Sequence, residues 1–439
     1  MTENLGMPAF KTVRGMRDFL PEEAKIMKYI ESKTRRVAEL YGYKEIITPV
    51  VEPYELLSAK AGEEVRSRMF VFKDLGGRDV ALRPEFTASV ARLVATTLKN
   101  EPRPFRLFCI GNIYRYDEPQ KGRYREFWQS NYELMGSDKP EADAEILMLT
   151  DSLMKMTGLK KYSFKVGHVG ILRGILSGEK LDDRAQNGIL QLMDKKQYED
   201  ALRLVEDSEV SKNCLALLKN LVKLKGNKIL EITQKIKKLV EGYEKAVDAA
   251  ENLYEILKLV LESGCKVDMT VEAGFARGLE YYTGMIVEPS VPELDIALGG
   301  GGRYDRLIEL FGGEPTPAVG IAHGIDRIML AMQSQKTLLM KKEEKRVMVI
   351  PIKDELMAKA LEISQMLRDA GMPVEVEVMR RKVTKALEDA DRREMNYAII
   401  IGERELKEGA VVLRDLKKRE QYIVKIEKII EAMKKQNLT

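Results

Sequence analysis

The sequence is poor in the side chains that build disulfide frameworks and metal sites. Its 439 residues include three cysteines, Cys109, Cys214 and Cys265, and two histidines, His168 and His323. The cysteines form no CxxC pair and neither histidine belongs to an HExxH pattern, which excludes a disulfide scaffold, a thiolate zinc site and a histidine-based metal site. We therefore expect buried free thiols and no metal held by protein side chains.

Long apolar runs and a strong net charge are also absent. No run of 18 apolar residues occurs, and Glu3, Gly6 and Pro8 interrupt the start, where a signal peptide would need an apolar stretch. We therefore expect a cytoplasmic protein without membrane contact. The 73 Lys and Arg against 69 Asp and Glu leave a charge of +4, so binding to a polyanion would require local clustering of positive charge.

The length and the changing residue patterns predict about three domains. A helix is expected over 22–41, and the residues after it are strand-rich in some segments and helical in others. We assign 1–157 and 268–335 to two parts of one strand-rich domain, 158–267 to a mainly helical insertion, 336–345 to a linker, and 346–439 to a small α/β domain with several parallel strands.

Two extended segments, 105–116 and 125–136, flank a polar loop and predict an antiparallel hairpin. Because side chains alternate along a strand, one face of the second segment carries Arg125, Phe127, Gln129, Asn131 and Glu133. Such a face suits a small zwitterionic ligand beside a nucleotide ring. The alternative is the solvent-exposed face of an edge hairpin.

Arginines and glycines add two further signals. Arg115, Arg123 and Arg125 bracket the hairpin loop, and guanidinium groups match phosphate oxygens in pairs, which suggests a triphosphate. Four consecutive glycines, Gly299–Gly302, allow close approach of backbone or ligand. A plain hairpin turn is the alternative, since the run matches neither the phosphate-loop nor the dinucleotide spacing.

Lysines concentrate in the expected insertion. The segment Ser211–Lys245 holds nine lysines against three glutamates, a local excess of six that exceeds the net charge of the whole chain. A polyanion could bind there, or the lysines could be the solvated face of surface helices.

Six motifs in order carry a resemblance to a known family. They are VRGMRDFLP (13–21), LRPEFT (82–87), YRYDEPQKGRYREFWQ (114–129), RGLEYYTG (277–284), GGGGRYDRL (299–307) and VGIAHGIDRI (319–328). The chain resembles the histidyl-tRNA synthetases, which are class II aminoacyl-tRNA synthetases, over essentially its whole length. RGLEYYTG and GGGRYD separate the histidine enzymes from other class II synthetases. Glu280 and Thr283 are more similar to archaeal or eukaryotic members.

This resemblance implies an α+β fold: an antiparallel-sheet catalytic domain with a helical insertion, and a C-terminal α/β anticodon-binding domain. It implies an ATP-dependent ligase that forms histidyl-adenylate and transfers histidine to tRNA(His), with Mg²⁺ accompanying ATP through phosphate oxygens. It also implies a homodimer formed through the first helix and the strand containing Pro49. The insertion would clamp the acceptor arm of the tRNA.

The resemblance also assigns roles to residues. Arg277 and Arg115 would be catalytic, with Arg115 on the α-phosphate. ATP would be bound by Arg115, Arg123, Phe127 and Arg327, with Phe127 stacked on adenine and Arg327 at the γ-phosphate. Histidine would be bound by Glu85, Phe86, Thr87, Gln129, Glu133, Arg277, Tyr281, Tyr282 and Tyr304. Among these, Glu85 and Thr87 would take the amino group, Gln129 the carboxylate, and Glu133 with Tyr282 the imidazole nitrogens.

Two rival functions share parts of this pattern. Synthetase-like regulatory subunits of the first histidine-biosynthesis enzyme typically lack the C-terminal domain and the RGLEYYTG arginine, whereas this chain has Arg277 and an α/β tail. Another class II synthetase is disfavoured by the two histidine-type motifs. Asp117 stands where bacterial members commonly have glutamate, which puts its contact in question, and for His323 packing is the expected role.

Overall fold

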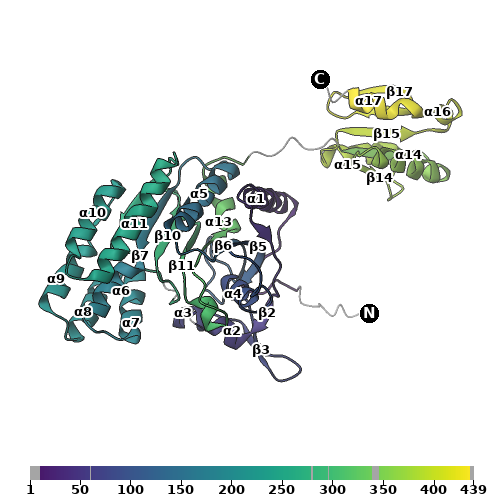
Figure 1. Cartoon of the computed structure of the whole chain (residues 1–439). Helices are drawn as coiled ribbons and strands as arrows, with labels where there is room; N and C mark the ends of the chain where they lie inside the picture. The colour runs from purple at the N-terminus through teal and green to yellow at the C-terminus, as the bar shows by residue number, and fades with distance from the viewer. Residues whose placement is uncertain (1–9, 60, 278–279, 295, 339–345, 436–439) are drawn as a thin grey trace. The chain divides into compact units, whose positions relative to one another are not determined.

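The computed structural model describes residues 10–59, 61–277, 280–294, 296–338 and 346–435. It divides into two units, Met1–Leu338 and Leu339–Thr439 (Figure 1). The division falls inside the expected linker, of which residues 339–345 lie outside the described part. Among the described helices none is both long and apolar enough to cross a membrane.

A nine-stranded sheet forms the centre of the first unit. In spatial order its strands are β1 (Lys44–Glu45), β5 (Phe105–Tyr114), β6 (Glu126–Met135), β12 (Ala318–Gly324), β11 (Gly299–Arg303), β10 (Met285–Ser290), β7 (Ser163–His168), β9 (Asp268–Glu272) and β8 (Lys225–Gly226). All neighbours are antiparallel except β1 with β5 and β7 with β9. The predicted hairpin is β5 with β6, and the antiparallel catalytic sheet is confirmed.

The segment around Pro49 differs from its prediction. The sequence indicates a strand over 45–52 that Pro49 interrupts, as at an edge, a bulge or an interface, but the structure has β1, and then β2 (Val51–Pro53) in a different sheet. Proline has no N–H to donate to a ladder, and the chain changes sheets at this position. The second sheet contains β2, β4 (Asp79–Leu82) and β3 (Val71–Lys73), and the short helices α2 (Tyr54–Ser58) and α3 (Glu63–Arg66) follow β2.

Helices cover the sheet and leave one face for polar side chains. Helices α1 (Pro21–Leu40), α4 (Thr87–Thr96), α5 (Pro140–Thr157) and α13 (Ile325–Ser334) pack on it, and α12 (Leu307–Leu310) packs on α4. Helix α1 starts with Pro21 in its first turn, which suits the fixed φ of proline. It buries Ile30 and Val37, and the Tyr132 hydroxyl of β6 donates to Thr34 O at 2.9 Å. Alternation therefore turns Glu133 of β6 to the opposite face.

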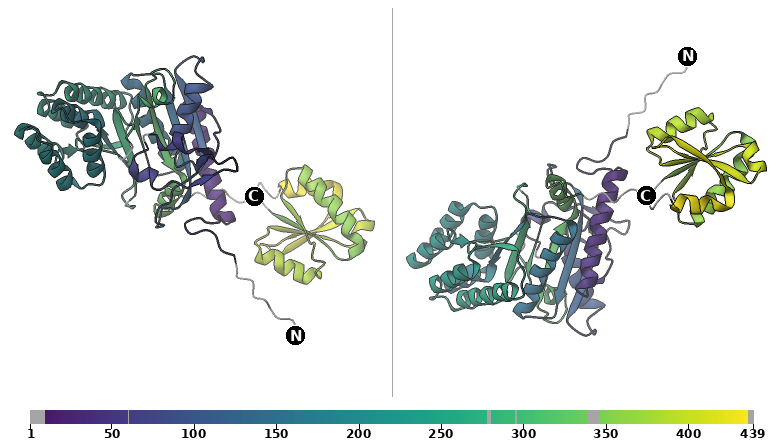
Figure 2. Two further views of the ribbon diagram at one scale, coloured as in Figure 1. Left: turned by 90° about the horizontal axis from the view of Figure 1, so that it is seen from below. Right: turned by 90° about the horizontal axis from the view of Figure 1, so that it is seen from above.

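The expected insertion is mostly helical, as the sequence indicates. Its helices are α6 (Val169–Gly178), α7 (Asp183–Asp194), α8 (Tyr198–Asp207), α9 (Lys212–Leu221), α10 (Ile229–Leu239) and α11 (Glu244–Glu262). They gather beside the sheet, with α11 packed on α5 and α6 (Figure 2). The same segment also contributes β7, an inner strand of the large sheet, so the helices extend directly from the sheet. Cys109 and Cys214 are buried free thiols, while Cys265 is half-buried.

The second unit is a five-stranded sheet with helices. Its strands, in spatial order, are β14 (Val374–Val376), β13 (Val347–Pro351), β15 (Tyr397–Ile401), β16 (Ala410–Asp415) and β17 (Glu420–Lys425). Its helices are α14 (Met357–Asp369), α15 (Val383–Arg392), α16 (Glu403–Lys407) and α17 (Ile429–Lys435), with 3₁₀ turns at Asp354–Leu356 and Ile426–Lys428. The first three strands are parallel, as predicted. The antiparallel pair β16 and β17 was not predicted.

Candidate active site

A polar cavity of about 220 Å³ opens on the face of the large sheet opposite α1. It gathers most of the residues that the sequence singled out: Glu85, Thr87, Arg115, Phe127, Gln129, Arg277, Tyr281, Tyr282, Tyr304 and Arg327. They come from β6, the start of α4, the segment after β9 and the start of α13, which are far apart in the chain. The sheet brings these segments to one cavity.

The polar face of β6 is a cavity wall and not an exposed edge. Gln129 is 9% exposed and Asn131 is 1% exposed. The amide oxygens of both side chains are buried and have no hydrogen-bond partner. Buried polar atoms are nearly always paired in folded proteins, so these two oxygens mark the position of donors that a ligand would bring.

Two arginines in the cavity carry positive charge that no described carboxylate neutralises through an ion pair. Arg115 Nε donates to Pro84 O at 2.8 Å, and Arg327 donates to Gly122 O at 3.1 Å and to Ala297 O at 2.9 Å. Burial, together with the neighbouring arginines 115, 123 and 277, lowers the pKa of Arg327 to about 10. A cavity that holds arginines against backbone carbonyls is arranged to receive an anion.

Arg277 is held differently, between the glycine run and an acid. A Cβ atom at Gly300 would overlap the Arg277 guanidinium group. The missing side chain of Gly300 therefore lets the guanidinium group of Arg277, a catalytic candidate, approach the backbone closely. Arg277 NH1 donates to Glu288 Oε2 at 2.8 Å, and Lys165 Nζ lies 2.7 Å from Glu288 Oε1.

A carboxylate pair lies at the other end of the cavity. Glu133 accepts hydrogen bonds from the hydroxyls of Thr87, at 2.7 Å, and Tyr304, and from the Asn131 amide. Burial raises the pKa of Glu133 to about 7. Glu85 accepts from the backbone N–H groups of Thr87, at 2.5 Å, and Ala88, at 2.8 Å, at the start of α4. Glu133 itself lies just beneath the wall formed by Thr87 and Tyr304.

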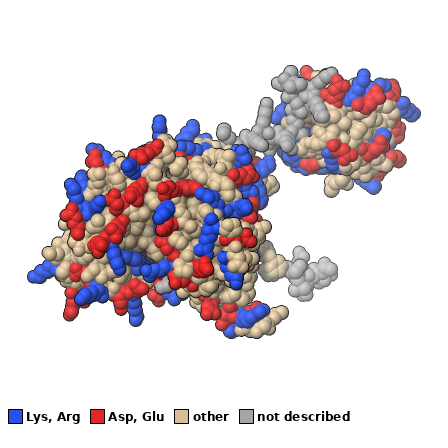
Figure 3. Space-filling model, viewed as in Figure 1, with Lys and Arg blue, Asp and Glu red and all other residues tan. Residues whose placement is uncertain are grey.

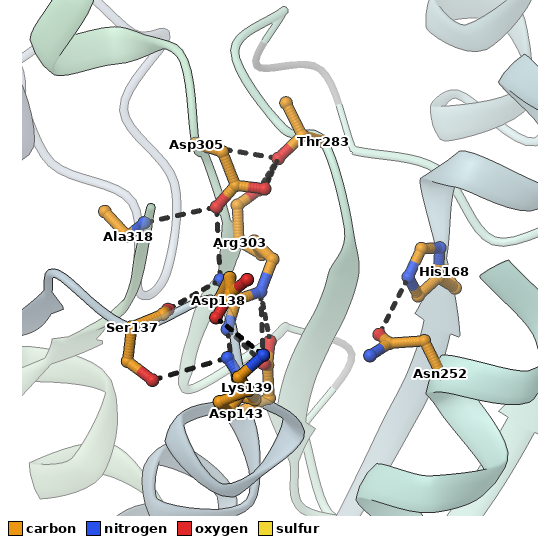
Figure 4. A network of polar contacts seen from close by, with 10 residues as sticks. All are labelled: Ser137, Asp138, Lys139, Asp143, His168, Asn252, Thr283, Arg303, Asp305 and Ala318. Carbon is orange, nitrogen blue, oxygen red and sulfur yellow. Dashed lines mark hydrogen bonds and ion pairs between the residues drawn. The ribbon is translucent and has the colours of Figure 1, made fainter. Parts of the chain in front are cut away.

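A buried network anchors the loop that carries the cavity tyrosines. Tyr281 packs on Tyr282 and Tyr304 with ring centroids 5.0 Å and 5.6 Å apart. Figure 4 shows the support behind this loop: Thr283 donates to Asp305 at 3.0 Å, and Asp305 accepts from Arg303 at 3.1 Å. Arg303 also binds Asp143 of α5 through two nitrogens, with Nε at 3.1 Å from Oδ1. Residues 278–279 of the motif lie outside the described part.

Three predicted residues have other positions. The Phe86 ring is buried in the core, 4.3 Å from the Arg83 guanidinium carbon, and its side chain does not line the cavity. Arg125, read as one of three phosphate-binding arginines, is buried, stacks on Tyr116 at 3.6 Å and donates to Asp117 O. The Arg123 Nε lies 3.9 Å from Asp117 in the hairpin loop, outside the cavity wall.

The histidines are packed, as expected for His323. His323 is fully buried, with Nε2 at 3.2 Å from the Thr150 hydroxyl, and burial lowers its pKa to about 3. His168 caps α6 by accepting from Gly170 N at 3.1 Å and lies 3.3 Å from Asn252 Oδ1 (Figure 4). It borders a second cleft, of about 780 Å³, between the insertion and the tyrosine loop.

Among the cavity residues that the sequence reasoning gave no role are Asn131 and Glu288. Lys165 pairs with Glu288 from outside the cavity lining. Asn131 was placed on the polar face of its strand but not assigned a ligand. Glu288 is a charged residue in the middle of the apolar strand Met285–Ser290, which was a usable signal. Lys165 is directly opposite it on β7.

The antiparallel sheet, the arginine at the end of a β hairpin, the second arginine at the start of α13 and the absence of a phosphate loop define the class. The fold and the cavity are those of a class II aminoacyl-tRNA synthetase. The chain belongs to the histidyl-tRNA synthetase family: the model for "Histidyl-tRNA synthetase" matches residues 15–328, and the model for "Anticodon binding domain" matches 346–436.

Relatives over nearly the whole chain support this assignment. The Histidine–tRNA ligase of Methanocaldococcus jannaschii is 42% identical over 422 residues, covering 96% of this chain and 98% of the relative. That of Pyrococcus furiosus is 38% identical over 429 residues, with 96% and 98% covered. The archaeal character expected from Glu280 and Thr283 is confirmed.

A solved structure adds a comparison with one of the rivals. It is described as an ATP phosphoribosyltransferase regulatory subunit/histidyl-tRNA synthetase from Bacillus halodurans. It is 27% identical with a TM-score of 0.74, covering 87% of this chain and 96% of that one. Because that protein is described by both names, this similarity does not separate a synthetase from a regulatory subunit. The anticodon-binding match and the cavity residues are the features that distinguish the two functions.

Proposed function

We propose that this cavity activates L-histidine with ATP to form histidyl-adenylate and pyrophosphate, and that the chain then transfers histidine to the 3′ end of tRNA(His). The single observation that carries this proposal is the joining, in one cavity, of two arginines that form no ion pair with a described acid and the tyrosine loop of the histidine family. An adenylating enzyme needs the first group for ATP and the second for its amino acid.

The chemistry requires charge and alignment more than proton transfer. The histidine carboxylate is already a nucleophile, so the enzyme must hold it in line with the α-phosphorus and offset the charge that develops there. Arg115 and Arg277 would supply this charge, with Phe127 beside the adenine and Arg327 at the far phosphate. The carbonyl partners of Arg115 and Arg327 leave their charge available.

Selectivity for imidazole follows from the buried polar groups. Glu133 and Tyr282 would each bind one ring nitrogen, Gln129 the carboxylate, and Glu85 with Thr87 the amino group. A different side chain would leave these groups unpaired in a desolvated site, and unpaired buried polar groups are costly. Burial raises the pKa of Glu133 to about 7, which supports a desolvated position for this carboxyl group.

Mg²⁺ would enter with ATP. The phosphate end of the cavity is lined by the guanidinium groups of Arg115, Arg277 and Arg327, which bind phosphate oxygens and not cations. The ion would therefore be held through phosphate oxygens and water and would offset phosphate charge. The arginines of the cavity fit this arrangement, in which the nucleotide and not a protein side chain would coordinate the ion.

We also propose a homodimer formed through the N-terminal part of the chain. Large apolar side chains are unusually exposed there: Leu40 57%, Ile47 93%, Val51 42%, Val71 47% and Leu75 111%. Of these, Leu40, Ile47 and Val51 lie on the first helix and the segment around Pro49, where the family resemblance implies the interface. The cytoplasm, where tRNA is charged for translation, is the proposed location.

The lysines of the insertion are proposed to contact the tRNA acceptor arm. All nine lysines of Ser211–Lys245 are exposed. The structure gives ion pairs for Lys228 with Glu231 and Lys237 with Glu251. Figure 3 shows both signs of charge interspersed over the viewed face of the first unit, so attraction to RNA would be local.

Histidine-dependent exchange of pyrophosphate into ATP tests the function. The full chain should exchange with histidine and not with other amino acids, whereas a regulatory subunit would give no exchange. Replacing Arg277 with alanine should lower the exchange rate by about 10²–10³-fold, as for a lost transition-state contact, while histidine binding by calorimetry persists. Normal single-turnover adenylation in Arg277→Ala would remove Arg277 from the mechanism.

A further inference from the structure

One acid in the cavity wall, Glu288, has no role in the proposed reaction. Its two carboxylate oxygens are divided between two cations: Oε2 accepts from Arg277 at 2.8 Å, and Oε1 lies 2.7 Å from Lys165 Nζ. Glu288 and Lys165 are paired residues on the adjacent strands β10 and β7. The side chains of all three are about a quarter exposed, and those of Arg277 and Glu288 line the cavity.

The position of the Arg277 guanidinium depends on this acid. Arg277 follows the end of β9, and one side of its guanidinium group is packed on the bare Cα of Gly300. On the other side, Glu288 is the described carboxylate that forms an ion pair with it. An arginine side chain loses much rotamer freedom when it is fixed, and a carboxylate on a rigid strand provides the second point that fixes it.

An acid beside a phosphate-binding arginine would ordinarily cancel the useful charge. Here Lys165 supplies a second positive charge, so that Arg277, Glu288 and Lys165 together carry +1. Asp194, at the end of α7 and also in the cavity wall, acts on Arg277, and Lys196, just after α7, acts on Glu288; their charges have opposite signs. The group therefore keeps the field of one cation toward a phosphate while Arg277 is held in place.

We infer that Glu288 is a positioning residue for adenylation, which aims the Arg277 guanidinium at the reacting phosphate, and that Lys165 preserves the positive charge of the pair. This inference rests on the proposed function, because it assigns a partner to the proposed catalytic arginine. Glu288 acts through Arg277 and contacts no substrate.

Three variants separate position from charge: Glu288→Gln, Lys165→Met and the double variant. Glu288→Gln releases Arg277 and should lower kcat of histidine-dependent exchange by about 10- to 100-fold, the scale of a small misplacement of a reacting group. Its KM for histidine should change by less than about threefold, since the amino group, carboxylate and imidazole of histidine are assigned to residues other than Arg277. Lys165→Met keeps the positioning acid, and its main effect should be a raised KM for ATP.

The double variant decides between the two explanations. Glu288→Gln with Lys165→Met restores the net charge of +1 but leaves Arg277 without its anchor, so exchange should remain as slow as in Glu288→Gln. Recovery toward the rate of the unmodified chain would show that the acid only balances charge, and the inference would be overturned. Glu288→Asp, with a shorter carboxylate, should give an intermediate kcat and keeps the test valid if the glutamine variant does not fold.

A double-mutant cycle with Arg277 tests whether Glu288 acts through it. In an Arg277→Ala background, Glu288→Gln should cause no further loss of exchange. A full additional loss would overturn the inference, whereas normal exchange in Arg277→Ala alone would overturn the proposed role of Arg277 instead. Glu145→Gln is the matched control, because it breaks a similarly exposed ion pair, Arg106–Glu145 at 2.7 Å, on α5. It should leave kcat unchanged.

Discussion

Arginines have two contrasting environments in this chain. In the cavity, Arg115 and Arg327 donate to backbone carbonyls, and burial lowers the pKa of both, with neighbouring arginines adding to the effect on Arg327. In the second unit, Arg381 is bound to Glu377 and Asp389, with nitrogen–oxygen distances of 2.7 Å and 2.9 Å. There hydrogen bonds from arginines lower the pKa of Asp389 to about 2.

The contrast between these arginines separates charges that stabilise the fold from charges that are available to a ligand. The charge of an ion-paired arginine is neutralised by carboxylates of the chain, so replacing such an arginine mainly lowers the stability of the fold. An arginine that donates to carbonyls and forms no ion pair with a described acid keeps more of its charge for a ligand, so the cavity favours an anion. Arg277, paired with Glu288 but compensated by Lys165, combines the two arrangements.

The largest effect is expected for a paired arginine in the interior. Asp143→Ala removes the acid that binds Arg303, whose side chain is 7% exposed, and leaves a buried guanidinium with one remaining acid, Asp305. Loss of one partner from a buried pair costs about 3–5 kcal/mol. The free energy of unfolding in urea should fall by this amount, whereas Asp354→Ala, which breaks an exposed ion pair with Arg380 in the second unit, should cost much less. Equal losses would show that burial does not distinguish these pairs.

The next effect separates catalysis from stability. Arg115→Ala should lower histidine-dependent exchange by about 10²–10³-fold, as for a lost charge contact in the transition state. The free energy of unfolding should not fall, because an uncompensated buried charge has been removed. Arg381→Ala is the matched control and should leave exchange unchanged. A large loss of stability in Arg115→Ala would contradict the contrast drawn between the two arginines.

The sequence predicted the fold where its patterns were local. Helix α1, the β5–β6 hairpin and the parallel strands of the second unit follow from periodicity and turn residues. The strand over 45–52 was wrong, because alternation alone does not show that the chain leaves one sheet for another at Pro49. The pair β16 and β17 was missed, since its pairing depends on residues that have no motif.

The sequence predicted which kinds of residue form the candidate site better than it predicted the contacts that they make. Strand alternation placed Gln129 and Glu133 on one face, and the family motifs supplied Arg277 and the tyrosines. The same motifs listed Phe86, and the cluster of arginines around the hairpin loop suggested Arg125, although the fold buries both side chains away from the cavity. Neighbourhood in sequence cannot show which way a loop side chain turns. The pairing of Glu288 with Arg277 also required the three-dimensional register of β10.

A smaller effect concerns the acid that burial affects most visibly in the cavity. Burial raises the pKa of Glu133 to about 7, so its carboxyl group is mainly protonated at pH 6 and ionised at pH 8. Only the carboxylate is a full acceptor for an imidazole N–H. The affinity for histidine should therefore rise with pH through about 7 and then level off.

Glu133→Gln isolates this effect. The glutamine does not titrate, and the remaining pH dependence should follow free histidine, whose imidazole titrates near about 6.5. Calorimetric binding from pH 5.5 to 8.5 gives both curves. Identical pH dependence in the two proteins would show that Glu133 is ionised throughout and that its burial is better compensated than that of Arg115.

The smallest effect extends the contrast to lysines of the insertion. Lys235 and Lys238 on α10 are exposed and form no ion pair with a described residue, whereas Lys258 on α11 lies 3.8 Å from Glu262. Each phosphate contact contributes about one unit to the slope of log affinity against log salt concentration. Replacing Lys235 and Lys238 with alanine should therefore reduce this slope for tRNA by up to about two, with pyrophosphate exchange unchanged. Lys258→Ala should change the slope less, because Lys258 already forms an ion pair with Glu262. An equal change would show that ion pairing within the chain does not determine which lysines contact RNA.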